Sequence, residues 1–138
     1  MKRGILVVGS GPSGAGKGTV MGEVFKRIND LNFSVSATTR APRSGERDGV
    51  NYRFVTNEEF DRMIAEGEML EFIEKFTNRY GTPKFAVESL LNQGKDVLLE
   101  IETIGASNVK RLMPECVSIF IAPPSLSALW ERLSGRMT

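Results

Sequence analysis

The sequence of 138 residues contains no histidine, only one cysteine, no long hydrophobic run and almost no net charge. The lack of histidine excludes histidine-based catalytic triads and imidazole metal sites. A lone cysteine, Cys116, excludes an intramolecular disulfide and is typical of a reducing cytoplasm. It begins an apolar run, so we interpret it as a buried small hydrophobic residue.

Charge and hydropathy exclude further classes. The 18 basic and 17 acidic residues leave a net charge of +1, so no overall field favours nucleic acid or a membrane surface. No apolar stretch approaches the roughly 20 residues that cross a bilayer. The first residues show no signal-peptide pattern. We therefore expect a cytoplasmic protein without nucleic-acid or membrane partners, long enough for one domain with a modest core.

Apolar runs alternate with helical patterns, which predicts an α/β fold: a parallel sheet flanked by helices, with right-handed crossovers. The runs 97–101 and 117–122 are typical of strands buried on both faces. An apolar stripe predicts a first helix through Leu31, and Thr56 begins another with a capping box. Ser125 is expected to cap the last helix. The expected strands are residues 4–9, 33–36, 51–55, 69–76, 97–101 and 117–122.

The middle of the chain differs from the two parts that flank it. Residues 36–80 are richer in loops and short strands, so we expect an insert over the edge of the sheet. Residues 1–35 and 81–138 would then form the core. The last predicted helix runs into a basic loop just before the chain stops. An apolar helix face normally needs a further layer, so we expect this core to be incomplete at its C-terminal end.

A glycine-rich loop with a lysine joins the first predicted strand to the first helix. Residues 11–18 read GPSGAGKG. Glycines let such a loop wrap closely, so that backbone N–H groups point at phosphate oxygens, and Lys17 can reach β- and γ-phosphates. Gly18 stands where the strict pattern has Ser or Thr for Mg²⁺, and Thr19 follows, so the metal ligands stay unassigned. The alternative is a flexible turn, but the context favours nucleoside-triphosphate chemistry.

A second basic segment follows the second predicted strand. Arg40 and Arg43 are three residues apart with Pro42 between them, so they could aim two planar guanidinium groups at one phosphate. Tyr52 could add a hydroxyl donor. Taken alone, this stretch is more typical of a solvated basic loop. It becomes informative beside the glycine-rich loop.

Five segments together closely resemble guanylate kinase. They read GPSGAGKGT from residue 11, SVSATTRAPR from 34, DGVNY from 48, RYGTP from 79 and VLLEIE from 97. In order and spacing the resemblance covers essentially all of Gly4 to Arg136. It implies a P-loop nucleoside monophosphate kinase that transfers the γ-phosphoryl of ATP to GMP or dGMP, with Mg²⁺ as cofactor, and that uses residues 36–80 as its GMP-binding insert.

The resemblance also implies which residues bind GMP. Two arginines and two tyrosines match the positions that hold the GMP phosphate, and Ser36 and Thr82 match positions near guanine O6. Glu71 matches the carboxylate that receives guanine N1–H and N2–H, and Glu102 stands where the family often has Asp. Adenine has an acceptor at N1, so ionised Glu71 would repel it. The implied GMP-binding residues are Ser36, Arg40, Arg43, Tyr52, Glu71, Tyr80, Thr82, Glu100 and Glu102.

Other positions match the ATP side. Glu100 is either an outer-shell partner of hydrated Mg²⁺ or a solvated carboxylate at the rim. Arg132 and Arg136 match positions near the adenine and phosphates, or are exposed arginines at a helix end. The implied ATP-binding residues are Gly11, Pro12, Ser13, Gly14, Ala15, Gly16, Lys17, Gly18, Thr19 and Arg132, and the implied catalytic residues are Lys17, Arg40, Arg43 and Arg136.

Two other interpretations stay open. A non-catalytic guanylate-kinase-like module would use the same face for a protein ligand, but such modules typically have a degraded phosphate loop, whereas this chain keeps Lys17. A kinase for another nucleotide is disfavoured by Glu71, Ser36 and Thr82 together. The sequence leaves open whether the chain forms a homo-oligomer.

Overall fold

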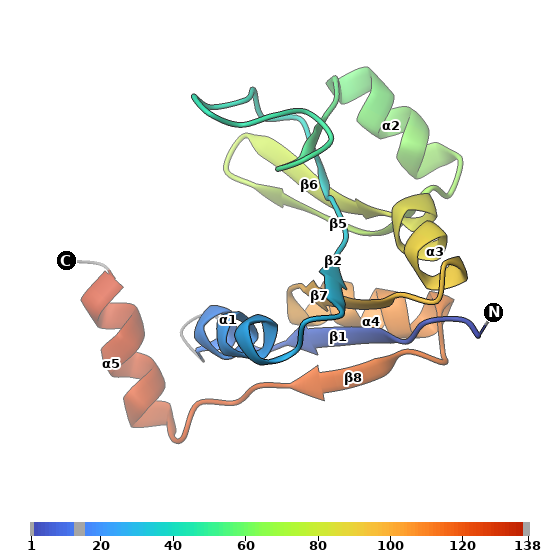
Figure 1. The fold of residues 1–138 in the computed structure, drawn as a ribbon. Coiled ribbons are helices and arrows are strands. Elements are labelled where there is room, and N and C mark those ends of the chain that lie inside the picture. The colour runs from blue at the N-terminus through green and yellow to red at the C-terminus, as the bar shows by residue number, and fades with distance from the viewer. Residues whose placement is uncertain (1, 13–15, 137–138) are drawn as a thin grey trace.

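The computed structural model describes residues 2–12 and 16–136 and contains two four-stranded sheets, one above the other in Figure 1. The first sheet is parallel, with strand order β2-β7-β1-β8. Its strands are β1 (Leu6–Ser10), β2 (Leu31–Phe33), β7 (Asp96–Glu100) and β8 (Val117–Phe120). The second sheet is mixed, with order β4-β3-β6-β5, and consists of β3 (Ala37–Thr38), β4 (Arg53–Phe54), β5 (Met69–Lys75) and β6 (Asn78–Pro83). The predicted α/β class with a parallel sheet is confirmed.

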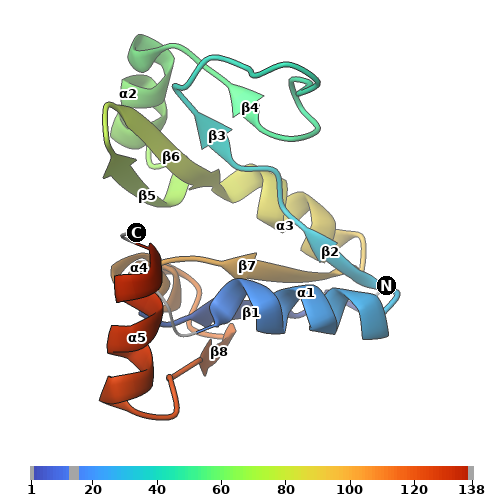
Figure 2. The ribbon, with the colours of Figure 1, turned by 90° about the vertical axis from the view of Figure 1, so that its left-hand side faces the viewer.

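Helices accompany these sheets: α1 (Lys17–Arg27), α2 (Asn57–Ala65), α3 (Lys84–Asn92), α4 (Thr103–Leu112) and α5 (Leu126–Arg136). Of these, α5 stands beyond the end of the parallel sheet rather than over one of its faces (Figures 1 and 2). On the parallel sheet, Val8 and Val97 point into a core with α3 and α4, whereas Met21 of α1 packs on the opposite face. A smaller core under the mixed sheet contains Phe60 and Met63 of α2. None of the helices in the described ranges is long and apolar enough to span a bilayer.

The expected burial on both faces holds for one apolar run and not for the other. Val97, Leu98 and Leu99 of β7 are buried, because β7 lies between β2 and β1. In contrast, Val117 and Ile119 of β8 are 47% and 45% exposed. The prediction was wrong for β8, since this strand lies at the edge of the sheet and pairs only with β1 among the described strands.

The capping residues predicted the helix ends better than the spacing of apolar residues did. Thr56 Oγ1 accepts a hydrogen bond from the Glu59 N–H at 3.1 Å, and Ser125 Oγ accepts one from the Ala128 N–H at 3.0 Å, as expected. The first helix, however, ends at Arg27, and Leu31 belongs to β2 instead. The helix does not continue to Leu31 because residues 31–33 pair with β7 instead, and this pairing satisfies backbone N–H and C=O groups of both strands.

Candidate active site

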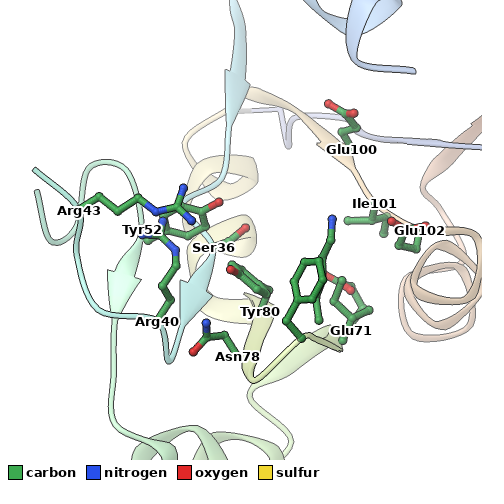
Figure 3. Close-up of a pocket in the computed structure, with 14 residues that line it drawn as sticks. Ser36, Arg40, Arg43, Tyr52, Glu71, Asn78, Tyr80, Glu100, Ile101 and Glu102 are labelled. Carbon is green, nitrogen blue, oxygen red and sulfur yellow. The ribbon is translucent and has the colours of Figure 1, made fainter. Parts of the chain in front are cut away.

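A cavity of about 620 Å³ is lined by residues of the mixed sheet, the loops beside it and the end of β7. Eight of the nine predicted GMP-binding residues line this cavity: Ser36, Arg40, Arg43, Tyr52, Glu71, Tyr80, Glu100 and Glu102. Figure 3 shows the two arginines with Tyr52 at one end of the cavity and the three glutamates at the other. The chain thus brings together, in one space, opposite charges from segments far apart in sequence.

At the basic end, Arg40 is held by Glu46. Its two terminal nitrogens donate to the two carboxylate oxygens of Glu46 at 2.8 and 3.0 Å, and the Arg43 N–H donates to the same carboxylate at 2.8 Å. The side chains of Arg40 and Glu46 are only 11% and 19% exposed. The hydrogen bond from Arg40, then that from the Arg43 N–H, lowers the pKa of Glu46 to about 2. Glu46 is therefore ionised at any physiological pH.

Aromatic rings complete the basic end. The Arg40 guanidinium lies 5.2 Å from the centre of the Tyr52 ring and 5.9 Å from that of Phe54. Tyr52 packs edge-on against Tyr80, with the ring centres 6.0 Å apart. Cation–π attraction and the ion pair fix the guanidinium in place, while the tyrosine hydroxyls remain available as donors. This end suits a multiply charged oxyanion.

At the acidic end, Glu71 of β5 is buried and faces Thr82 of β6. The antiparallel pairing places these two residues opposite each other, and the Thr82 hydroxyl donates to Glu71 Oε1 at 2.7 Å. Thr82, the ninth predicted GMP-binding residue, does not line the cavity itself but orients the carboxylate that does. Burial raises the pKa of Glu71, the hydrogen bond from Thr82 lowers it, and the nearby charge of Glu102 raises it.

The carboxyl end of β7 brings two further carboxylates. Glu100 and Glu102 are exposed, and Glu102 is the N-cap of α4. Glu100 Oε1 lies 3.7 Å from the point where a Cβ on Gly18 would be, so it faces the first turn of α1. In the ranges that the structure describes, no three acidic or cysteine side chains gather into a metal-binding group. Glu100 therefore connects the cavity to the start of α1 without forming a metal site of protein ligands alone.

The described part of the phosphate loop is shaped by two glycines. A Cβ on Gly11 would lie 2.2 Å from the Ile121 carbonyl oxygen, so only glycine fits there. Gly16 is the N-cap of α1 and has a φ of 93°, a left-handed conformation that favours glycine. Arg132 of α5 lies near it, with one terminal nitrogen 3.7 Å from the Cβ position of Gly16. Thr19 and Gly18, in the first turn, are exposed.

Some predicted residues lie outside what the structure describes. These are Ser13, Gly14 and Ala15 of the loop, together with the side chains of Lys17 and Arg136. Their predicted roles stay predictions. Pro12, by contrast, is described and partly exposed at the end of the first strand.

Sequence reasoning missed several residues of the cavity. Lys75 and Phe76 lie at the tip of the β5–β6 hairpin, and the rest of the lining consists of Ile73, Asn78, Gly81 and Ile101. Glu46 was missed too, although an acidic residue inside an otherwise basic loop is a signal that an arginine there needs a partner. No local pattern could identify the hairpin residues, because pairing of β6 with β5 places them at the cavity.

Comparisons with known proteins agree with this geometry. The family model described as guanylate kinase matches residues 2–138. The chain is 54% identical to the guanylate kinase of Clostridioides difficile (strain 630) over all of its 138 residues, and 51% identical to that of Shouchella clausii (strain KSM-K16) over 99% of them. In both cases the match covers 67% of the relative, so the chain spans about two thirds of the length of these curated relatives.

A solved structure of a guanylate kinase also matches this chain. The crystal structure of guanylate kinase from Anaplasma phagocytophilum matches with a TM-score of 0.70 and 38% sequence identity, over 99% of this chain and 70% of that one. The relatives carry the name of an enzyme, which favours the catalytic interpretation over the non-catalytic module. This chain belongs to the guanylate kinase family, whose members are ATP:GMP phosphotransferases.

Proposed function

We propose that the cavity binds GMP or dGMP and that the chain transfers the γ-phosphoryl group of ATP to it, giving ADP and the nucleoside diphosphate. The observation that carries this proposal is the division of one cavity into a basic, hydroxyl-rich end and an acidic end. GMP has the complementary halves: a dianionic phosphate and a base whose N1–H and N2–H edge donates hydrogen bonds. A cavity of about 620 Å³ falls in the usual range for small-molecule sites.

The basic end would hold the acceptor phosphate. Arg40 lines the cavity and is held in place by Glu46, so its positive charge would face the phosphate. Arg43 is exposed and can turn toward the same phosphate, and the hydroxyls of Tyr52 and Tyr80 can donate to its remaining oxygens. Charge-assisted hydrogen bonds of this kind both bind and orient the group.

The acidic end would read the base. Ionised Glu71, oriented by the Thr82 hydroxyl, would accept the two donors of guanine. Ser36 would supply a hydroxyl near O6, and Glu102 would lie close to the amino group. Adenine would present its N1 acceptor to a buried carboxylate and leave it unpaired. Selection for guanine over adenine is therefore expected to be strong.

The donor side would use the glycine-rich loop. Backbone N–H groups of residues 11–19 and Lys17 would bind the β- and γ-phosphates of ATP, and Arg132 and Arg136 would contribute positive charge. Glu100, a carboxylate facing the first turn of α1, fits an outer-shell partner of hydrated Mg²⁺. Mg²⁺ bound there would neutralise phosphate charge.

The chemistry needs no general base, which agrees with a chain that lacks histidine. An anionic oxygen of the GMP phosphate attacks the γ-phosphorus of ATP, the bond to the β,γ-bridging oxygen breaks, and ADP leaves with that electron pair. Rate enhancement comes from positioning and from positive charge near the transferred group. We propose that residues 36–80 form the GMP-binding insert over a core of residues 1–35 and 81–138, and that the enzyme is cytoplasmic.

Two measurements test the proposal. Calorimetry of the chain with GMP and AMP is expected to show binding of GMP and at least 100-fold weaker binding of AMP, an order of magnitude typical of polar mismatches in buried sites. A coupled assay with ATP and Mg²⁺ is expected to show ADP formation that depends on GMP but is very slow, because the chain spans about two thirds of the length of its relatives. Preference for AMP would contradict the proposal, and GMP binding without any phosphoryl transfer would favour the non-catalytic module.

A further inference from the structure

The first turn of α4 forms one wall beside the Glu71 carboxylate, and a glycine occupies the point of contact. Gly105 is the third residue of α4 and is buried. A Cβ placed on it would lie 2.8 Å from Glu71 Oε2 and 3.4 Å from both Cδ and Cγ of the same side chain. The three nearest atoms all belong to Glu71. Any larger residue here would therefore collide with that carboxylate.

The backbone does not explain why this residue is glycine. Gly105 is in an α-helix, and it is absent from the residues with positive φ. Glycine destabilises a helix relative to alanine, so a buried helical position with no conformational need for glycine calls for another reason. The space taken up by the Glu71 carboxylate supplies that reason.

Glu71 has little freedom to move away from α4. Its side chain is buried, with only 8% of the residue exposed, and Oε1 accepts the hydroxyl hydrogen of Thr82, which is 2% exposed. A carboxylate pushed from the α4 side would lose this hydrogen bond or move into the cavity, where the base would lie. Closely packed interiors pass such a displacement on to neighbours rather than absorb it.

We propose that Gly105 is a specificity-determining positioning residue: by lacking a side chain, it lets the Glu71 carboxylate take the one position from which it accepts both N1–H and the amino group of guanine. This inference rests on the proposed function of the cavity. Gly105 acts through Glu71 and touches no ligand itself. Its effect should therefore depend on the amino group, which IMP lacks while keeping N1–H and O6.

The matched pair of variants is Gly105→Ala and Gly22→Ala. Gly22 is also helical, in α1, but a Cβ there would meet nothing within 4 Å. Calorimetry with GMP and with IMP is expected to show unchanged affinities for Gly22→Ala. For Gly105→Ala we expect at least about tenfold weaker GMP binding and a clearly smaller loss for IMP, so that the preference for GMP over IMP shrinks. A purely structural role would lower both affinities equally.

A second background separates the contact from general damage. Glu71→Asp shortens the side chain by one methylene and withdraws the carboxylate from α4. Gly105→Ala is then expected to change GMP affinity by less than about twofold, a non-additive pair. If Gly105→Ala alone fails to fold, the double variant must fold for the inference to stand.

Three outcomes would overturn the inference: GMP binding by Gly105→Ala equal to that of Gly22→Ala, equal losses for GMP and IMP, or additive effects in the Glu71→Asp background. Failure of the unmodified chain to bind GMP would instead contradict the proposed function. The two failures are thus distinguishable.

Discussion

At one end of the cavity Arg40 and Glu46 form an ion pair that keeps some contact with solvent, whereas at the other end Glu71 and Thr82 are buried. The difference follows from what each end is proposed to bind. A phosphate group is always ionised, so cations fixed near the surface bind it through charge-assisted hydrogen bonds. A base is neutral, and only desolvated hydrogen bonds discriminate strongly between two bases, because a mismatch there leaves a buried group unpaired.

The largest effect is expected at the buried carboxylate of the acidic end, Glu71. Glu71→Gln replaces two acceptor oxygens by one acceptor and one donor, and that donor opposes a donor of guanine. GMP binding is expected to weaken by about 100-fold or more, measured by calorimetry. The variant should melt no lower than the unmodified chain at neutral pH, since a buried carboxylate with a raised pKa destabilises the fold as pH rises through that pKa. Undiminished GMP affinity would refute the assignment of the acidic end.

A smaller loss is expected at the basic end. Glu46→Gln keeps the shape of the side chain but removes the charge that holds Arg40 by two hydrogen bonds. A guanidinium that is no longer held would make weaker charge-assisted hydrogen bonds, so GMP binding is expected to weaken by about tenfold to 100-fold. The preference for GMP over AMP should stay unchanged, because the base end is intact. If this variant lost the preference for GMP over AMP, the conclusion that the two ends bind phosphate and base separately would be contradicted.

The comparison also predicts a pH dependence. Burial raises the pKa of Glu71, whereas its partners hold the pKa of Glu46 at about 2. Binding of the guanine edge needs ionised Glu71, so affinity should fall as pH falls through the raised pKa, at higher pH than for an ordinary glutamate. Glu46 stays ionised over that range. Calorimetry across pH on the chain and on Glu71→Gln tests this, since titration of the GMP phosphate is common to both and the difference isolates Glu71.

The smallest effect is expected at an ion-pair cluster away from the cavity. Arg62 on α2 contacts Glu59, Glu66 and Glu68, much as Arg40 contacts Glu46, but its side chain is 44% exposed. Arg62→Ala is expected to leave GMP affinity unchanged and to lower the melting temperature only slightly, because solvent-exposed ion pairs contribute little. A loss of GMP binding here would show that the mixed sheet responds as a whole rather than at its cavity.

Local sequence patterns predicted much of this molecule. The strand before and the helix after the glycine-rich loop, the caps at Thr56 and Ser125 and the apolar run of β7 each depend on neighbours in sequence, and each was found where expected. Patterns erred where a competing long-range contact decided. The apolar residues up to Leu31 have helical spacing, but Leu31 belongs to strand β2, because it pairs with the neighbouring strand β7.

The site shows the same division. Arg40, Arg43 and Glu71 could be proposed from the residues and the resemblance, since their chemistry suits GMP and their spacing matches the family. The importance of Thr82 for Glu71 needed the register of β5 and β6. The contact of Gly105 with Glu71 joins residues that are far apart in sequence, and no local signal marks it.

By itself the sequence determined a glycine-rich strand-to-helix loop, a pair of arginines and an α/β sheet, because glycine freedom, side-chain charge and apolar periodicity are local properties. Only the tertiary structure decided that one cavity has a basic and an acidic end, and that Glu71 and Thr82 are buried at the acidic one. Burial, hydrogen-bond partners and the shift in the pKa of Glu71 depend on which distant residues pack against it. Those contacts form only when the two sheets and α4 come together.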